Sequence, residues 1–363
     1  MNAASWEQKL CWLKLHTPYT EKALRRLKPR PDCCLTVRFH IDLKMVPLIE
    51  ALSHKVQLQV FPCHHDTTDP EGWVHLRKET PATLLKEWDP IACRKHLEKG
   101  RPYLCDLGGR LIGWAVEENL PVGAALEGTT SGISHLTRIL GGESPPFPIL
   151  DWNQARLKQD IHNEKMVGFS LWQTFTEVTR LSLHGKTCGV LGFGPVGRGI
   201  ARTARNLGAR VGIFDPDPQA RILASFEGFW SPERDQLLSS SDLLVTATGT
   251  SNVLVMDDLN HLPQRAFLIN AGHSEEEICE EIRLRTSRES VLPHVERLDL
   301  GQGKEIFLLA QGRLLNLAAG FGDTVNAFDL TTAQLVDALE YLLREGPNCR
   351  PALQSIPPTF FSG

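Results

Sequence analysis

The chain has 363 residues, of which 42% are hydrophobic and 23% charged, a balance that excludes disordered and fibrous proteins. Lysine and arginine number 39 against 43 acidic residues, so a net charge of -4 gives no basic excess for binding nucleic acid or an anionic membrane. No apolar run approaches the ~18 residues of a membrane span. The N-terminal residues lack a secretion-signal pattern, and nine cysteines without CxxC spacing indicate reduced thiols. We expect a cytoplasmic protein.

The first half of the chain alternates between helix and strand patterns. Helical spacing of apolar residues predicts helices over 5–27 and 43–52. Period-two alternation predicts strands over 35–39 and 56–62. A strand–helix–strand order predicts a parallel sheet covered by helices. The proline and glycine residues around 141–153 predict a loop or linker.

The second half repeats this alternation. A long helical pattern over 155–182 leads to a strand at 187–191, and a final helix at about 331–344 returns to one of the two domains. Further strands are predicted at 209–214, 242–247, 266–270 and 306–309.

These patterns predict an α/β fold with two domains. A substrate-type α/β domain takes residues 1–169, with 330–363 returning to it. A Rossmann-type domain, with a doubly wound parallel sheet, takes residues 170–329. We expect the cleft between the domains to hold the reactive end of a cofactor together with the substrate.

A glycine-rich turn connects the strand at 187–191 to a helix. Gly192 permits the tight turn, Gly194 lets the backbone approach a pyrophosphate, and Gly197 allows the helix to pack closely on the strand. The phosphates then lie at the helix N-terminus, beside Pro195 and Val196. A turn that binds nothing is the alternative, but the flanking strand and helix disfavour it.

An acidic residue completes the dinucleotide fingerprint. Asp215 directly follows the next predicted strand, where a carboxylate accepts the adenosine ribose hydroxyls of NAD and repels the extra phosphate of NADP. Two later strands end in small or polar residues, as the wall beside a cofactor requires. These are Thr246, Thr248 and Gly249 after one strand, and Ala271, Gly272 and His273 after the other. The sequence therefore predicts NAD as the cofactor.

With these motifs in place, the chain resembles the S-adenosylhomocysteine hydrolase family. The resemblance is strong at 192–199, 246–250, 270–273 and above all 308–320, a stretch that ordinary hydroxyacid dehydrogenases lack. It is fainter at 39–42, 106–109, 127–132 and 158–163. Together these segments span the chain from about residue 35 to residue 335.

The resemblance implies a redox-assisted elimination. Bound NAD oxidises a ribose 3′-hydroxyl to a ketone, the ketone acidifies the neighbouring C–H bond, a thiol leaves, water adds and the hydride is returned. The reaction needs general bases beside the sugar. By resemblance the catalytic candidates are Lys158, His40 and His273, and we add His162 because an imidazole can act as a base near neutral pH. The further cofactor contacts that it implies are Thr129, Thr130, Ser131, Asn163 and Asn316.

Several positions depart from the family pattern. Leu107 and Gly128 stand where the resemblance expects two carboxylates that hold the ribose diol. His162 replaces an expected aspartate, and Asp323 replaces an expected histidine. A site built around hydroxyl contacts discriminates by ~10⁴–10⁵, so we expect poor hydrolysis of adenosylhomocysteine itself. The remaining candidate substrate contacts are Asp42, Asp106, Glu127 and Asp323.

The retained bases favour an enzyme that acts on a different nucleoside-like or thioether small molecule. A simple NAD-dependent dehydrogenase and a non-catalytic NAD-binding homologue remain as alternatives. By resemblance we expect a homodimer.

Cys63-His64-His65-Asp66 invites a metal site, but adjacent residues at a strand end point to opposite sides, so we expect a polar loop and no metal. We expect the glutamates at 275–277 to form a solvated helix start.

Overall fold

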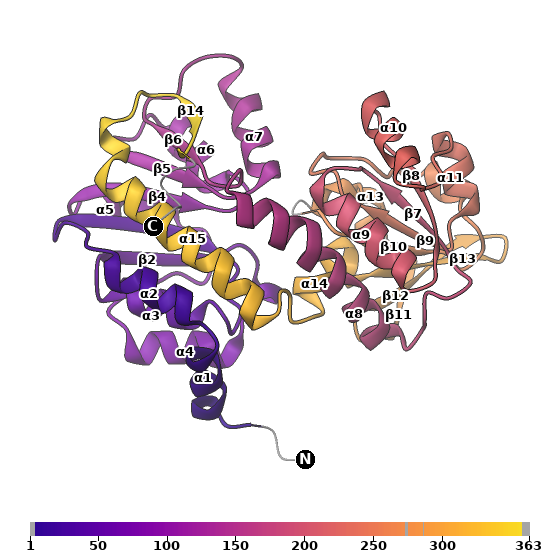
Figure 1. The fold of residues 1–363 in the computed structure, drawn as a ribbon, viewed down its shortest axis with the longest axis horizontal. Helices are drawn as coiled ribbons and strands as arrows, with labels where there is room; N and C mark the ends of the chain where they lie inside the picture. Colours follow the sequence, from indigo (N-terminus) through magenta and orange to yellow (C-terminus); the bar gives the residue numbers. More distant parts are fainter. Residues whose placement is uncertain (1–3, 273–274, 286, 358–363) are drawn as a thin grey trace. The chain divides into compact units, whose positions relative to one another are not determined.

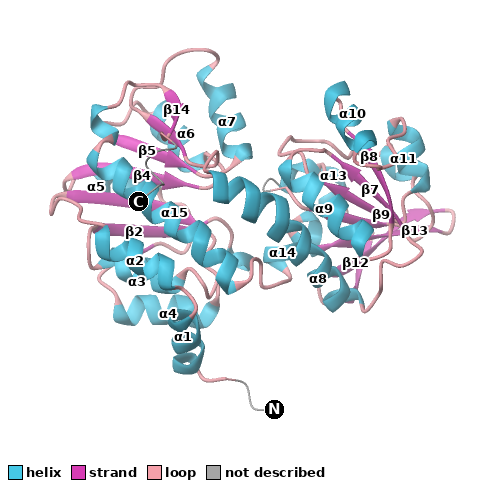
Figure 2. Cartoon of the chain, in the orientation of Figure 1, coloured by secondary structure: helices cyan, strands magenta, loops and turns pink. Residues whose placement is uncertain are grey.

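The computed structural model describes residues 4–272, 275–285 and 287–357, and the chain forms two compact units (Figure 1). Each unit has its own sheet and hydrophobic core, and Figure 2 shows helices flanking the strands of each sheet. The expected fold class is therefore confirmed. Unit 1 ends at Gln159 and resumes at Val325, while unit 2 runs from Asp160 to Thr324, so both boundaries lie earlier in the chain than we expected. Among the described residues, no helix is long and apolar enough to cross a membrane.

Unit 1 contains a seven-stranded sheet in which every neighbouring pair is parallel. Its strand β1 is buried along its whole length, because helices cover both faces of a parallel sheet. The strand order reverses between β1 and β4, and ligands of open α/β sheets bind beyond the carboxyl ends at such a point. In sheet order the strands are β14 (Leu353–Ser355), β6 (Ile149–Asp151), β5 (Ala124–Glu127), β4 (Arg101–Asp106), β1 (Cys33–Phe39), β2 (Gln57–Pro62) and β3 (Thr83–Leu84).

The helices of unit 1 bury apolar faces on this sheet and on one another. The last of them, α15, returns from the far end of the chain and buries Leu335, Leu339 and Leu342, spaced three to four residues apart, in the unit 1 core. The α-helices are α1 (Trp6–Leu15), α2 (Pro18–Arg26), α3 (Val46–Ser53), α4 (Pro70–Glu79), α5 (Pro90–Leu97), α6 (Arg110–Glu117), α7 (Thr130–Leu140) and α15 (Val325–Arg344), with short 3₁₀ turns at His65–Thr67 and Gly346–Asn348.

Unit 2 also contains a seven-stranded sheet, of which five neighbouring strands are parallel, while β12 pairs antiparallel with both β13 and the edge strand β11. The strand order reverses between β7 and β9, so the turns that follow these two strands lie together at the switch point. In sheet order the strands are β11 (Arg288–Leu292), β12 (Val295–Gly301), β13 (Lys304–Leu309), β10 (Phe267–Asn270), β9 (Leu243–Thr246), β7 (Thr187–Leu191) and β8 (Arg210–Phe214).

A long helical stretch leads into the sheet of unit 2 and is π-helical over Lys158–Met166 before it continues as α8 (Val167–Thr179). A side chain at Gly168 or Gly199 would collide with the neighbouring backbone, so this stretch packs closely against α9 (Pro195–Asn206). The remaining α-helices are α10 (Pro218–Phe226), α11 (Arg234–Ser240), α12 (Asp258–His261), α13 (Glu280–Arg283) and α14 (Leu315–Ala318), with 3₁₀ turns at Glu275–Glu277 and Ala310–Gly312.

Two sequence-based expectations are wrong in detail. The helix expected over 5–27 is two helices, because Pro18 begins α2 and a proline cannot continue α1. The loop expected over 141–153 contains strand β6, which pairs with strands on both sides. The antiparallel strands β11 and β12 were not expected, because their many polar residues hide the strand pattern.

Candidate functional site

The glycine turn after β7 has the geometry that a pyrophosphate requires. Gly192 has a φ of 103°, and a Cβ placed there would lie 2.6 Å from the Ala247 carbonyl oxygen. A Cβ on Gly197 would overlap the carbonyl of Gly192, so only glycine permits this packing. At Gly194, in contrast, nothing lies within 4 Å of an added Cβ, which leaves open space beside the turn.

The helix that begins at this turn supplies hydrogen-bond donors. Gly194 is the N-cap of α9 and Pro195 is its first residue, so proline's missing N–H costs nothing there. The next backbone N–H groups, of Val196 and Gly197, belong to the first turn, which has no intrahelical acceptors. Free N–H groups and the positive end of the helix dipole beside an open space fit a dinucleotide's phosphates.

Asp215 lies beside the turn, as the fingerprint predicts. It follows β8, and its Oδ2 accepts the Phe193 N–H across 2.8 Å while its Oδ1 accepts the Asp217 N–H across 2.9 Å. A carboxylate has about four acceptor positions, so two remain for ribose hydroxyls. These two hydrogen bonds orient the carboxylate before any ligand binds.

A buried glutamate, Glu277, holds the loop that follows β9, and the sequence analysis did not predict its burial. Glu277 is fully buried rather than solvated, and it accepts hydrogen bonds from the Thr248 N–H, the Thr248 hydroxyl and the Gly249 N–H at 3.0, 3.1 and 2.6 Å. Burial raises the pKa of this carboxyl. A Cβ on Gly272 would collide with the Glu277 carboxylate, which explains why glycine stands there. Glu277 thus holds the loop after β9 by hydrogen bonds and packs closely against Gly272 after β10.

Other expected cofactor residues around this loop are partly engaged by protein. The Thr246 hydroxyl donates to Asn270 Oδ1 across 3.2 Å and is buried, so it supports the loop from within. Ala271 is buried beside it. His273 lies outside the described residues.

Helix α14 and the residues that follow it contact the helical stretch formed by Lys158–Met166 and α8. The Asn316 Nδ2 donates to the Ser170 hydroxyl across 3.1 Å, and the Gly322 N–H donates to the Asn316 carbonyl across 2.9 Å. Asn316 Oδ1 is buried, and no described residue hydrogen-bonds to it. An acceptor of this kind suits a ligand amide N–H such as a carboxamide. Asn163, on the same helical stretch, is also buried.

The Asp323 carboxylate is engaged by a histidine of the helical stretch. Its side chain is only 3% exposed, and its Oδ2 lies 2.5 Å from Nδ1 of His162. The Asp323 carboxylate is thus enclosed and paired with an imidazole through Oδ2, and the substrate contact expected of this residue stays a prediction.

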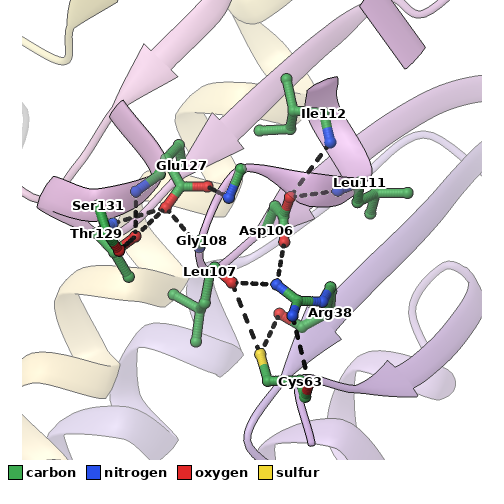
Figure 3. Close-up of polar contacts among 12 residues, drawn as sticks. Arg38, Cys63, Asp106, Leu107, Gly108, Leu111, Ile112, Glu127, Thr129 and Ser131 are labelled. Carbon is green, nitrogen blue, oxygen red and sulfur yellow. Dashed lines mark hydrogen bonds and ion pairs between the residues drawn. The ribbon is translucent and has the colours of Figure 1, made fainter. Parts of the chain in front are cut away.

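The carboxyl ends of β4 and β5 in unit 1 carry two buried carboxylates (Figure 3). Glu127 accepts the N–H groups of Gly108, Gly109 and Thr129 at 3.0, 3.0 and 2.8 Å, and the Thr129 hydroxyl at 2.6 Å. Burial and the nearby charge of Asp106 raise the pKa of Glu127, which these donors oppose. Glu127 is fully buried and accepts hydrogen bonds from protein groups, which gives it a structural role, and the substrate contact expected of it stays a prediction.

Asp106 is likewise fully buried. It accepts the N–H groups of Leu111 and Ile112 at the start of α6, at 2.7 and 3.2 Å, and it pairs with Arg38 at 3.4 Å (Figure 3). Sequence reasoning missed Arg38, because nothing in its strand predicts a buried cation. Burial raises the pKa of the neighbouring Cys63 thiol to about 12, so this thiol stays protonated. Asp106 is therefore also a structural group, and the substrate contact expected of it stays a prediction.

The positions of the two missing family carboxylates touch one another. A Cβ on Gly128 would lie 2.5 Å from Trp152 Nε1 and 2.8 Å from Leu107 Cδ2. Trp152 is 4% exposed, and the Lys158 ammonium lies 5.5 Å from its ring centroid, within cation–π range. Leu107, Gly128 and Trp152 together form what we call the apolar site of unit 1. It fills the space that a glutamate at position 128 would need.

The remaining candidates of unit 1 lie at the ends of neighbouring elements. His40 follows β1, and its Nδ1 lies 2.8 Å from the Thr67 hydroxyl. The hydroxyl of Thr129 caps α7 by accepting the Gly132 N–H, and the Thr130 hydroxyl accepts from Asn153 across 3.0 Å. Ser131 Oγ lies 3.3 Å from Thr129 Oγ1.

Asp42 is also held by protein groups. Its Oδ2 pairs with the buried Lys44 ammonium at 2.8 Å, and its Oδ1 accepts the Met45 N–H across 3.1 Å. Both oxygens therefore serve the loop that leads into α3. Its proposed substrate contact would have to use the acceptor positions that these two bonds leave.

The possible metal ligands after β2 converge instead of diverging. His64, His65 and Asp66 offer ligand atoms within 4.8 Å of one another, because residues 65–67 form a 3₁₀ turn rather than extended chain. The expectation that they point apart is therefore wrong. However, His64 Nδ1 accepts the Asp66 N–H, and His65 is 75% exposed and pairs with Asp66. The polar contacts of the turn account for the cluster, and we assign no metal to it.

Comparisons with known proteins agree with this geometry. Residues 166–322 match the family model of the NAD-binding domain of S-adenosyl-L-homocysteine hydrolase, which lies within unit 2. An S-inosyl-L-homocysteine hydrolase of Methanopyrus kandleri is 32% identical, with 95% of this chain and 85% of that protein aligned. An adenosylhomocysteinase of Thermococcus kodakarensis is 31% identical over 98% of this chain and 88% of that protein. The chain belongs to the S-adenosyl-L-homocysteine hydrolase family.

An adenosylhomocysteinase of Thermotoga maritima is a further family relative, 29% identical over 97% of this chain and 91% of that protein. Among solved structures, a dipicolinate synthase polypeptide from Bacillus halodurans has a TM-score of 0.52 at 14% identity, covering 87% of this chain and 99% of that one, and shows the fold alone. As a family member with the NAD-binding domain, the chain uses NAD, and the glycine turn, Asp215 and Asn316 fit that group.

Proposed function

We propose that this family member is an NAD-dependent hydrolase of a thioether substrate that it recognises without the two carboxylates of the ribose-diol contact. The observation that carries this proposal is the apolar site of unit 1. A side chain at position 128 would meet both Trp152 and Leu107, and neither the leucine nor the glycine has a side-chain acceptor for a sugar hydroxyl. The cofactor turn of unit 2 is complete, so the departure affects substrate recognition more than NAD binding.

The proposed chemistry uses the bases that the chain retains. When bound, NAD accepts a hydride from a secondary alcohol and returns it at the end of the reaction. Lys158 and His162, four residues apart in the π-helical stretch, take the proton of the alcohol and that of the neighbouring acidic C–H bond. His40 and His273 serve the departing thiol and the entering water. Lys158 lies over an aromatic face, where its cation is held but still partly exposed.

The relatives support a family whose substrates vary, because curated members are named both for S-adenosyl and for S-inosyl-L-homocysteine. A thioether of homocysteine with another nucleoside-like alcohol is the substrate class that we propose. We further propose that the chain acts in the cytoplasm and forms a homodimer. Light scattering of the purified protein would test the homodimer by its mass.

The substrate proposal is tested by comparing S-adenosyl-L-homocysteine with its 2′-deoxyribose analogue. The NAD-loaded chain is mixed with each compound, and reduced nicotinamide and released nucleoside are followed. We expect little adenosine, and a rate with the deoxy analogue that is no lower than with the ribose compound. The Thermotoga adenosylhomocysteinase serves as the control. Robust adenosine release by this chain, with a ~10⁴-fold fall for the deoxy analogue, would contradict the proposal.

A further inference from the structure

His162 and Asp323 join two segments that are 161 positions apart in the sequence. The Nδ1–Oδ2 distance is 2.5 Å, and the two side chains differ in exposure, at 29% for the imidazole and 3% for the carboxylate. The carboxylate is thus enclosed, while the imidazole keeps part of its surface open. An enclosed carboxylate is stable only when paired, and the imidazole is its partner here.

The contact is fixed by its surroundings. Met166 and Ser170 follow His162 at intervals of four residues on the same helical stretch. The Ser170 hydroxyl contacts Asn316 at 3.1 Å, and the Met166 sulfur lies 3.7 Å from the Thr324 hydroxyl. The segment 316–324 therefore lies along one side of the helix and brings its carboxylate to the imidazole. Contacts at both ends of the segment preorganise the pair.

The chemistry of this pair follows from its donors and acceptors. An ionised carboxylate can only accept, so a neutral imidazole facing it through Nδ1 must carry its proton on Nδ1. Its Nε2 is then left with a lone pair and can take a proton from another group. The same carboxylate stabilises the imidazolium that forms when Nε2 does so.

The residue types at these two positions are reciprocally exchanged relative to the family pattern. The resemblance expects an aspartate at position 162 and a histidine at position 323, and this chain has the opposite at both. Because the structure pairs the two side chains, the double exchange retains one imidazole and one carboxylate. It moves the imidazole to the helical stretch that carries Lys158.

We propose that Asp323 is a positioning residue that holds His162 in its Nδ1–H tautomer, so that Nε2 serves as a base in this chain. The inference rests on the proposed function for the use of that base, but the tautomer itself is independent of any substrate. Asp323 thereby gains a role different from the substrate contact that its place in the sequence suggested.

The tautomer is tested by ¹⁵N NMR of histidine-labelled full-length chain, with H162Q used to assign the signals of His162. At a pH where the ring is neutral, we expect the Nδ1–H form in the wild type. In D323N the amide donates to Nδ1, so we expect the Nε2–H form, and in D323E the carboxylate restores the Nδ1–H form. An unchanged tautomer in D323N, or an Nε2–H form in the wild type, would overturn the proposal.

A second set of variants tests the coupling of the two side chains even where a single substitution destabilises the fold. H162D places two carboxylates together and D323H two imidazoles, whereas the double variant H162D/D323H restores one of each. We expect both single variants to lower the melting temperature of the NAD-loaded chain, and the double variant to recover most of the loss. Purely additive losses would count against a coupled pair.

Turnover measurements then separate the positioning role of Asp323 from the proposed function of the enzyme. With a substrate that the wild type converts, D323N should lower kcat by about 10²–10⁴-fold with little change in KM or NAD retention, and D323E should restore part of it. If D323N leaves kcat unchanged, His162 does not act as this base. If the wild type converts no thioether, the proposed function fails while the NMR result still decides the positioning role.

Discussion

Asp215 accepts a hydrogen bond from the backbone N–H of Phe193, within the glycine turn, across 2.8 Å. The bond couples the end of β8 to the turn that follows β7, so the acidic residue and the phosphate-binding backbone are positioned together. The cofactor half of the site is thus organised by backbone geometry that is already formed in the chain.

The first prediction concerns Asp215. D215A removes a charged acceptor for the ribose hydroxyls, and such hydrogen bonds contribute about 1.5–3 kcal/mol, so NAD affinity should fall roughly 10–150-fold. The preference for NAD over NADP should also shrink, because the repulsive charge is gone. Calorimetric titration of both dinucleotides into cofactor-stripped protein measures this. Unchanged NAD affinity in D215A would place the ribose elsewhere.

The second prediction separates two glycines of the turn. G194A meets open space at an ordinary φ of -69°, so the variant should fold normally but lose NAD affinity, since its methyl occupies the side where the pyrophosphate approaches. G197A drives a methyl into the Gly192 carbonyl, so it should lower the free energy of unfolding by about 1–3 kcal/mol. Urea unfolding and NAD titration of both variants check this. Equal stability losses in the two would refute the distinction.

The third prediction concerns the apolar site of unit 1. G128A places a methyl 2.5 Å from Trp152 Nε1, so it should cost about 1–3 kcal/mol of stability, and G128E at least as much. W152F removes the atom in conflict, so the double variant G128A/W152F should lose less than the two single variants sum to. Urea unfolding measures each, with G194A as the open-space control. A G128E variant of full stability would show that the site has room for the family's glutamate.

The fourth prediction is a pH dependence. Burial lowers the pKa of His96, whose Nε2 donates to the Gln57 carbonyl. Because the unfolded chain binds this proton more readily, the His96 contribution to stability is complete above the ordinary pKa of about 6.5 and is lost as pH falls below it. The free energy of unfolding should therefore drop between pH 7.5 and 5.5 less steeply in H96Q than in the wild type. Identical slopes would mean that His96 titrates normally.

The cofactor turn could be predicted from sequence because its determinants are local. Gly192, Gly194, Gly197 and Asp215 are defined by spacing within one strand–turn–helix–strand unit, and the structure places them as expected. The buried roles of Asp106 and Glu127 were not predictable in this way. A sequence position identifies a carboxylate at a strand end, but only the surrounding N–H groups show that protein already uses it.

The other features that the sequence did not predict depend on contacts between residues far apart in the chain. Glu277 sits in a run of glutamates that resembles a solvated helix start, and only the fold shows that its carboxylate is buried against Gly272. The pairing of His162 with Asp323 spans most of unit 2 in sequence, so the two departures from the family pattern looked independent. The same holds for Leu107 and Gly128, because only the fold shows that Leu107 and Trp152 both border the space beside Gly128.

A crystal structure of the full chain grown with excess NAD tests the central claim most directly. We predict the pyrophosphate at the open side of Gly194, the adenosine ribose hydroxyls on the Asp215 carboxylate, and the nicotinamide carboxamide within hydrogen-bond distance of Asn316 Oδ1. An empty glycine turn, or a dinucleotide whose ribose does not touch Asp215, would contradict the cofactor role on which the proposed chemistry depends.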